Sequence, residues 1–273
     1  MGQLEDELEF AKRIVLRAGE IVLKKAERDI EVKSKGIDGD VTAGDFASND
    51  YLVKQIMSQF PDHGLLSEER DDDKTRLGKE RVWIIDPIDG TEQYKKFARS
   101  GRNKEFSDWC VQVGLSVGGK ASVGALYIPV TGELFYATKG SGAFREFDGK
   151  VEQLKVNNKL NGRYKVTRGF LTNPRTAGLV KHMRQRGGGN IERYFGSIGT
   201  ALASLSKNDE IDAYCQASGE HRLGEWDLCA PEVIASEAGA LVTNGFGKRY
   251  GYNKPEPFCI PIVIAQRRQG IVI

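Results

Sequence analysis

The 273-residue sequence predicts a protein that joins an α+β first half to an α/β second half. Three observations predict this class. Two helix-like segments come first, short strand-like runs then follow one another, and strand-like and helix-like segments alternate in the remainder. A boundary is expected near residue 150, so that residues 1–150 form an N-terminal half and residues 151–273 a C-terminal half.

The first half opens with two amphipathic helices. Apolar residues recur at steps of three and four from Leu4 to Val22, which predicts a helix of about 25 residues. A second helix is expected over residues 46–60, ended by Pro61. The period then changes to that of mostly antiparallel strands, which we expect over residues 82–85, 110–117, 121–127 and 133–137.

The second half alternates between the two kinds of element. Strands are expected over residues 154–156, 166–171, 211–215 and 260–265. Helices are expected between them, over residues 175–185, 196–206 and 229–238. This alternation is typical of an α/β layer.

Composition excludes several classes of protein. Lys and Arg number 40 and Asp and Glu 38, so the net charge of +2 gives no general attraction to nucleic acid or membrane. No apolar run approaches the ~18 residues of a membrane span, and the N-terminus lacks the pattern of a secretory signal. Four cysteines without Cys-x-x-Cys spacing and three histidines argue against a zinc cluster. We therefore expect a cytoplasmic protein in which carboxylates form any metal site.

The segment from Trp83 to Thr91 is the most informative. A buried strand is expected to end at Asp86, and Asp89 follows three residues later. Gly90 lets the backbone approach a ligand closely, and Thr91 supplies a hydroxyl. Carboxylates and backbone carbonyls are the ligands of a hard cation such as Mg²⁺. The alternative is that each aspartate only forms an Asx-turn.

Other acids stand at the ends of apolar runs or beside helices. Glu68 and Glu69 follow Leu65-Leu66-Ser67, and Asp45 stands at the start of the second helix. Asp227 precedes the helix expected over residues 229–238. Each of these residues, taken alone, is explained as well by a turn or a helix cap.

Taken together, these segments resemble the inositol monophosphatase superfamily of magnesium-dependent, lithium-sensitive phosphatases. The resemblance spans nearly the whole chain and rests on motifs in the family's order and approximate spacing: Val-Thr-x-x-Asp45, Ser67-Glu68-Glu69, Asp86-Pro-Ile-Asp-Gly-Thr91, Gly196-Ser197 and Trp226-Asp227. It implies a layered α-β-α-β-α fold like that of sugar phosphatases, with the site between the two halves.

The resemblance implies a set of metal ligands. Glu68, Asp86 and the carbonyl of Ile88 would hold one Mg²⁺, and Asp86, Asp89 and Asp227 a second. A third, weaker ion would lie near Glu68, partly through water. Most of these ligands belong to residues 1–150, whereas Asp227 belongs to residues 151–273 with the substrate-specificity residues.

The resemblance also implies catalytic and substrate-binding residues. Asp45 and Thr91 would orient or deprotonate the attacking water, and Glu68 is a catalytic residue with them. Backbone N–H groups of Gly90 and Thr91 would hold the phosphate. Gly196 and Ser197, at the start of a helix, would add donors.

The downstream segments are most similar to the 3'(2'),5'-bisphosphate nucleotidase branch, whose substrate is 3'-phosphoadenosine 5'-phosphate. The strings that carry this similarity are Trp226-Asp-Leu-Cys-Ala-Pro-Glu-Val-Ile234 and Tyr252-Asn-Lys-Pro255. Cations from Lys95 to Lys104 suit a second phosphate, or are only a solvated basic loop. The nucleotidases often carry a lysine after the Gly-Ser pair, and Gly196-Ser-Ile-Gly-Thr-Ala201 has none.

Several alternatives stay open. An inositol-1-monophosphatase or broad-specificity sugar phosphatase is the nearest, a non-catalytic metal- or nucleotide-binding module the next. Nucleic-acid binding through residues 95–104 is disfavoured by the charge and the lack of a motif. The expected partner is a small phosphate ester, and both a homodimer and a monomer fit the resemblance. We also expect residues 71–78 to form a mobile loop that orders with metal, and His221, in segment 217–224, to lie on the surface.

Overall fold

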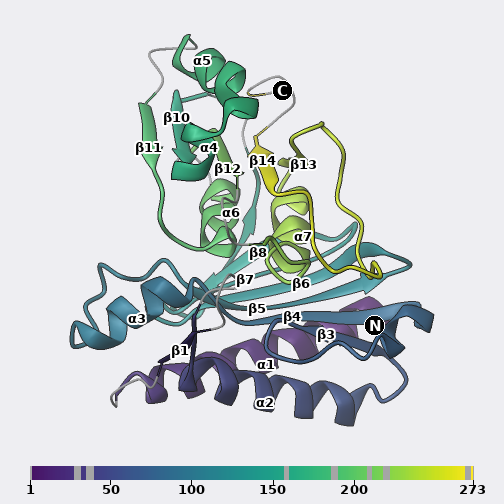
Figure 1. The fold of residues 1–273 in the computed structure, drawn as a ribbon. Helices are drawn as coiled ribbons and strands as arrows, with labels where there is room; N and C mark the ends of the chain where they lie inside the picture. The colour runs from purple at the N-terminus through teal and green to yellow at the C-terminus, as the bar shows by residue number, and fades with distance from the viewer. Residues whose placement is uncertain are drawn as a thin grey trace.

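The computed structural model describes residues 2–27, 32–34, 40–156, 160–185, 190–207, 211–217, 222–267 and 272. These residues form five layers, α-β-α-β-α, which confirms the predicted fold class (Figure 1). From one side to the other, the layers are α1 and α2, a seven-stranded sheet, α6 and α7, a five-stranded sheet, and α4 and α5. In the part of the chain described, no helix is both long and apolar enough to cross a membrane.

The outer helices of the first half agree with the sequence pattern. α1 (Gln3–Lys25) buries Phe10, Ile14 and Val22 against the sheet, as its three- and four-residue steps predict. α2 (Ala43–Gln59) begins three residues earlier than predicted, because Thr42 and Asp45 form a capping box there. A short two-stranded sheet precedes α2, formed by β1 (Val32–Ser34) and β2 (Asp40–Thr42).

The seven-stranded sheet runs in chain order from β3 to β9 and is antiparallel except for the β3–β4 pair. The strands expected over residues 110–117, 121–127 and 133–137 are confirmed, but the strand expected over residues 154–156 is wrong. Lys150–Leu154 pairs with the preceding strand through a tight turn at Asp148 and Gly149. The strands are β3 (Gly64–Ser67), β4 (Arg81–Asp89), β5 (Cys110–Val117), β6 (Lys120–Ile128), β7 (Glu133–Thr138), β8 (Gly142–Phe147) and β9 (Lys150–Leu154).

The five-stranded sheet has the order β11-β10-β12-β14-β13, so β14 lies between β12 and β13. The strand expected over residues 166–171 is wrong. Only Val166 is in a strand, and the hydroxyl of Thr167 then caps a short helix. The strands are β10 (Arg163–Val166), β11 (Asn190–Arg193), β12 (Ala213–Ala217), β13 (Leu241–Asn244) and β14 (Ile262–Gln266).

The remaining helices connect the sheets. α6 (Ile198–Ser206) and α7 (Cys229–Glu237) are buried on nearly all sides between the two sheets, which explains why small and apolar residues occupy most of their positions. α3 (Thr91–Arg99) follows β4 directly. The others are α4 (Arg168–Thr172), α5 (Ala177–Gln185) and the 3₁₀ turns η2 (Thr75–Gly78) and η3 (Pro174–Thr176).

Candidate active site

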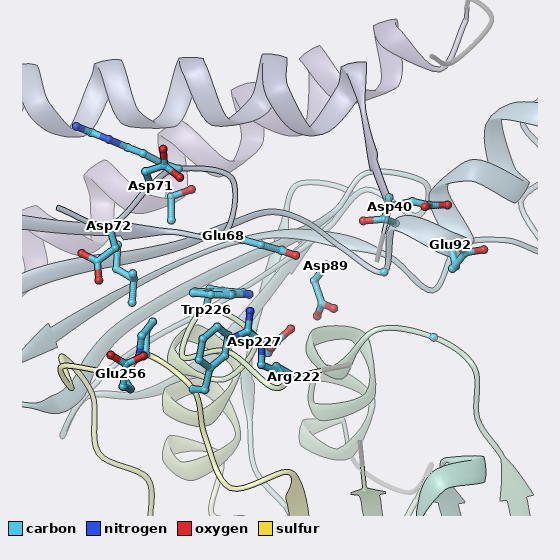
Figure 2. Close-up of a pocket in the computed structure, with 18 of the residues that line it drawn as sticks. Asp40, Glu68, Asp71, Asp72, Asp89, Glu92, Arg222, Trp226, Asp227 and Glu256 are labelled. Atoms are coloured by element: carbon cyan, nitrogen blue, oxygen red, sulfur yellow. The ribbon is translucent and has the colours of Figure 1, made fainter. Parts of the chain in front are cut away.

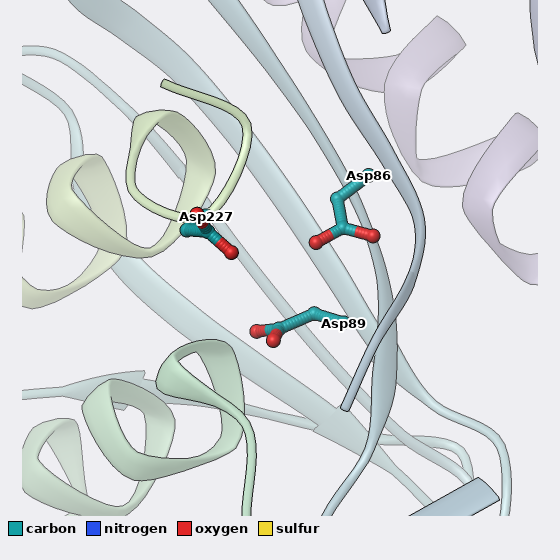
Figure 3. A group of neighbouring side chains, drawn as sticks. All are labelled: Asp86, Asp89 and Asp227. Carbon is teal, nitrogen blue, oxygen red and sulfur yellow. The ribbon is translucent and has the colours of Figure 1, made fainter. Parts of the chain in front are cut away.

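Two aspartates at the end of β4 face the same side. In a regular strand, residues three apart point to opposite faces, but the pairing of β4 with β5 shifts register between Asp86 and Asp89. Both side chains are buried, and Figure 3 shows them directed toward Asp227. One carboxylate oxygen from each of these three residues lies within 4.8 Å of the others. We call Asp86, Asp89 and Asp227 the aspartate cluster.

Asp227 joins the cluster from the loop before α7. Its Oδ2 accepts the backbone N–H of Gly224 at 2.6 Å, which closes a tight turn. A Cβ on Gly224 would lie 2.2 Å from the ring of Trp226, so this turn requires glycine. Glu68 approaches from the other side, where it follows β3. Its N–H donates to the carbonyl of Ile85 at 3.3 Å, and its carboxyl group is hydrogen bonded to Asp86.

Burial and mutual repulsion disfavour the charged forms of these acids. The pKa of Asp86 is raised well above its ordinary value by burial, and further by Glu68, Asp89 and Asp227. Burial raises the pKa of Asp89 to about 6, although hydrogen bonds from Gly199 and Ser197 oppose the rise. A cation bound between buried carboxylates would offset both their burial and their mutual repulsion. The donor set is all oxygen, so these residues fit a hard divalent ion such as Mg²⁺.

Gln112 is a residue of this site that the sequence analysis missed. It lies on β5 opposite Asp86 and is 1% exposed. Its Nε2 is 3.4 Å from Asp86 Oδ2 and 3.3 Å from Asp89 Oδ2, so one amide contacts two members of the cluster. Its Oε1 is buried and has no hydrogen-bond partner among the residues described. A glutamine inside an otherwise apolar predicted strand was the available signal.

Asp45 serves as a helix cap and also reaches the site. Its Oδ2 accepts the N–H and the hydroxyl of Thr42 at 2.7 and 2.5 Å. Its Oδ1 is 3.4 Å from Thr91 Oγ1, which is also 3.2 Å from the carbonyl oxygen of Ile88. Capping therefore does not prevent Asp45 from reaching Thr91, and its catalytic role stays a prediction. Thr91 links Asp45 to the backbone between the two aspartates of β4.

The N-terminus of α3 opens onto the site. Gly90 has φ of 91°, and a Cβ there would lie 2.9 Å from the carbonyl oxygen of Asp108. Only glycine therefore fits this position. Gly90 and Thr91 both line the cavity described below. First-turn N–H groups of a helix lack intrahelical acceptors and attract anions, so this turn suits a phosphate.

The N-terminus of α6 is used differently. The N–H of Gly199 donates to Asp89 Oδ2 at 2.7 Å, so this helix binds a carboxylate of the cluster. Ser197 donates its N–H to the carbonyl of Asp108 at 3.1 Å, and its hydroxyl accepts the N–H of Thr200 at 2.9 Å. Gly196, by contrast, lines the cavity. Phosphate binding by Gly196 and Ser197 stays a prediction. Gly196 fits it better, because the N–H and the hydroxyl of Ser197 already have partners within the protein.

A cavity of about 740 Å³ joins these residues (Figure 2). Glu68, Asp89 and Asp227 line it together with three aromatic side chains and three cations, and Figure 2 shows Trp226 and Arg222 close to Asp227. The rings of Trp226 and Phe258 are 5.8 Å apart, edge to face, and the Arg222 guanidinium lies 3.9 Å from the centre of Phe258. The other members are Phe195, Arg70 and Lys74.

Of the two interpretations of the cations over residues 95–104, contact with a second phosphate is not supported, because none of these residues lines the cavity. Residues up to Arg99 belong to α3 and not to a loop. Lys95 is buried and forms ion pairs with Asp40, at 2.5 Å, and with Glu92. Arg102 pairs with Glu27 at 3.2 Å. The cations that line the cavity are instead Arg70, Lys74 and Arg222. These residues are far apart in the sequence, so their spacing did not predict that they share a cavity.

Two further expectations concern loops. The segment over residues 71–78, expected to be mobile, contains η2, and its Arg76 is buried. Asp72 and Asp73 form turns by accepting the N–H groups of Lys74 and Thr75. Ordering of this segment by metal stays a prediction. His221 and its three preceding neighbours lie outside the described residues.

The five layers and the buried acidic cluster define the class as metal-dependent phosphatases. Comparison with known proteins agrees. The chain belongs to the inositol monophosphatase family, whose model matches residues 3–268. The protein is therefore a metal-dependent phosphoric monoester hydrolase, as predicted.

The names of individual relatives state different activities. The chain is 28% identical over 269 residues to an inositol monophosphatase of Dictyostelium discoideum, covering 94% of this chain and 91% of that protein. It is 29% identical over 260 residues to the 3'(2'),5'-bisphosphate nucleotidase CysQ of Salmonella typhimurium, covering 93% and 97%. The extragenic suppressor protein suhB of Bartonella henselae has the same fold, with a TM-score of 0.78 at 21% identity over 98% of this chain and 96% of that one.

Proposed function

We propose that this protein is a Mg²⁺-dependent 3'(2'),5'-bisphosphate nucleotidase that hydrolyses 3'-phosphoadenosine 5'-phosphate to AMP and phosphate. The observation that carries the choice of substrate is that aromatic rings and cations line the same cavity as the acids. Similarity to relatives does not make this choice, because inositol monophosphatases and a nucleotidase match at 28% and 29% identity.

The cavity wall suits a nucleotide. Phe195, Trp226 and Phe258 offer flat apolar faces, and Phe195 is 61% exposed where it lines the cavity. Stacking a base on an aromatic side chain contributes about 1–3 kcal/mol. Arg70 and Arg222 suit a second phosphate, because guanidinium groups match phosphate oxygens. An inositol monophosphate has neither a flat ring nor a second phosphate.

The proposed mechanism uses the groups around Thr91. Thr91 Oγ1 donates a hydrogen bond to Asp45 Oδ1 and presents its lone pairs to the attacking water. As the water gives a proton to Thr91 Oγ1, the hydroxyl proton of Thr91 passes to the Asp45 carboxylate. The first turn of α3 binds the phosphate oxygens through its N–H groups. When bound by Glu68, the aspartate cluster and the Ile88 carbonyl, two or three Mg²⁺ ions would screen the phosphate charge, lower the pKa of water and stabilise the leaving oxygen.

The direct test measures phosphate release from 3'-phosphoadenosine 5'-phosphate and from inositol 1-phosphate, each with Mg²⁺, with and without Li⁺. We expect kcat/KM to favour the nucleotide by about a hundredfold, which corresponds to roughly 2.7 kcal/mol. A preference for inositol 1-phosphate would make the protein an inositol-1-monophosphatase. Equal rates on several sugar phosphates would make it a broad-specificity phosphatase.

A pair of variants tests the aromatic wall separately. Phe195→Ala should raise KM for the nucleotide about tenfold and leave KM for inositol 1-phosphate unchanged. Phe246→Ala is the matched control, because Phe246 is 73% exposed and is not among the residues of the cavity wall. If both variants behave like the parent, the base does not stack on Phe195.

The resemblance also supports proposals about the protein's state. We expect inhibition by Li⁺, and a homodimer is one candidate assembly. A cytoplasmic location was expected from the scattered cysteines. The structure describes all four as free thiols, at Cys110, Cys215, Cys229 and Cys259.

A further inference from the structure

Arg76 is a buried cation beside the cavity that the proposed mechanism does not use. Its side chain is only 1% exposed, although it lies in the loop that follows Glu68. Its Nε and Nη2 donate to the two carboxylate oxygens of Asp72 at 3.0 and 2.7 Å, which makes a bidentate ion pair. Asp72 lines the cavity, so Arg76 fixes the wall on the side of Glu68.

The same guanidinium holds a segment far along the chain. Nη1 donates to Asn253 Oδ1 at 2.8 Å, and Nη2 donates to the carbonyl of Lys254 at 3.0 Å. Asn253 Nδ2 donates in return to the carbonyls of Arg76 and Lys79 at 3.2 and 3.3 Å. The two segments are therefore connected by hydrogen bonds in both directions.

Asn253 and Lys254 in turn hold Glu225, which is fully buried. Their N–H groups donate to its carboxylate at 2.7 and 3.0 Å, and Lys254 Nζ lies 2.9 Å from it. Glu225 stands two residues before Asp227, in the turn that directs Asp227 to the cluster. A continuous series of polar contacts thus connects the loop after Glu68 with the loop that carries Asp227.

This connection spans the two sides of the cavity. Figure 2 shows Asp72 and Glu68 coming from one side and Trp226 and Asp227 from the other. The acids that meet between them repel one another, so the fold must resist their separation. A buried ion pair is a weak source of stability but fixes geometry well when its hydrogen bonds are complete. The planar fork of arginine suits such a bridge better than an ammonium group.

We infer that Arg76 is a positioning residue for metal binding. It holds the segment of Glu225 and Asp227 against the segment that follows Glu68, so that carboxylates from both sides share the same cations. The inference rests on the metal site of the proposed function and not on the choice of substrate.

The test measures binding of Mg²⁺ alone, without substrate, by titration calorimetry on the full chain. Arg76→Met should raise the Kd for Mg²⁺ about tenfold, in the range found for groups that orient metal ligands. Arg81→Met is the matched control. Arg81 also makes a bidentate pair, with Glu7 at 3.1 and 3.0 Å, but neither residue lines the cavity. The control should lower the melting temperature and leave Kd within about twofold.

Two results would overturn the inference: an unchanged Kd in Arg76→Met, or an equal increase in both variants. Should Arg76→Met fail to fold, Asn253→Gly tests the same connection, because glycine accepts the φ of 57° at this position. Its Kd should also rise severalfold, and an unchanged value would count against the inference. Absence of Mg²⁺ binding by the unsubstituted protein is a distinct result, which would remove the metal site itself.

Discussion

Two helices begin beside the aspartate cluster, and their N-terminal N–H groups are used differently. The first turn of α3 lines the cavity with Gly90 and Thr91. The first turn of α6 is already occupied, because Gly199 donates its N–H to Asp89. Both turns attract anions for the same physical reason. The difference teaches that a helix N-terminus beside an acidic cluster is open to a substrate anion only where no protein carboxylate has taken its donors.

Replacing the carboxylate that α6 binds should have the largest effect. Asp89→Asn, at the end of β4, removes a predicted metal ligand and the anion at the N-terminus of α6. We expect kcat/KM to fall at least about 10⁴-fold, roughly 5.5 kcal/mol of transition-state stabilisation. Without metal the variant should melt at a higher temperature than the parent, because burial opposes ionisation of Asp89. Full activity in the variant would remove Asp89 from the metal site.

Removing the hydroxyl at α3 should have the next largest effect. Thr91→Ala should lower kcat about 10³-fold, since the water loses its link to Asp45. Thr91→Ser keeps the hydroxyl and should recover most of the rate. Steady-state kinetics at saturating Mg²⁺ measures both variants. Equal losses in the two would show that the methyl group matters and the hydroxyl does not.

A third helix, α7, carries a buried acid that should make the stability of the protein depend on pH. Glu232, in the first turn of α7, is buried and accepts a hydrogen bond from Tyr252. Burial raises its pKa from 4.5 to about 7. The folded state therefore holds this proton more tightly than the unfolded state, so stability falls as pH rises from about 4.5 through about 7.

Glu232→Gln should remove that dependence. The variant should match the parent near pH 4.5 and exceed its free energy of unfolding by at most about 3 kcal/mol near pH 8.5. Urea denaturation at the two pH values measures the difference. A parent that is as stable as the variant at the higher pH would mean that Glu232 ionises without penalty.

The smallest effect is expected at the cap of α6. Ser197→Ala removes the acceptor for the N–H of Thr200 and a hydrogen bond to Asp89, and it should cost about 1 kcal/mol of stability while lowering kcat far less than Thr91→Ala does. Thermal denaturation measures the loss of stability, and steady-state kinetics measures the change in kcat. A fall in kcat comparable to that of Thr91→Ala would show that Ser197 contacts the phosphate, and the two helices would then be alike.

Local sequence predicted the elements whose signals are local. The apolar steps of α1 and the acids around β4 needed no knowledge of the rest of the chain. The strand expected over residues 82–85 was too short, because the sequence Asp86-Pro87 resembles a turn although a register shift lets β4 continue to Asp89. The helix over residues 168–172 was missed because Phe170 and Leu171 look like strand residues and the cap at Thr167 decides the outcome.

Parts of the site that depend on pairing between distant segments could not be predicted. Gln112 reaches the cluster only because β5 pairs with β4, and Gly199 only because α6 lies between the sheets. The basic loop was overestimated, since sequence does not reveal that Asp40 neutralises Lys95. The strand order of the five-stranded sheet could not be predicted from the sequence either, because β14 pairs between β12 and β13, which both precede it in the chain.

The late position of β14 in the sequence has a consequence for folding during synthesis. The N-terminus leaves the ribosome first, and contacts between sequence neighbours form fastest. The seven strands from β3 to β9 follow chain order, so their sheet can close early. β12 can pair with the earlier strand β10, but its other edge must wait for β14, which is synthesised after Asp227. We therefore expect the nascent chain to display Asp86 and Asp89 for some time before their third partner arrives, and catalytic competence to be among the last properties it acquires.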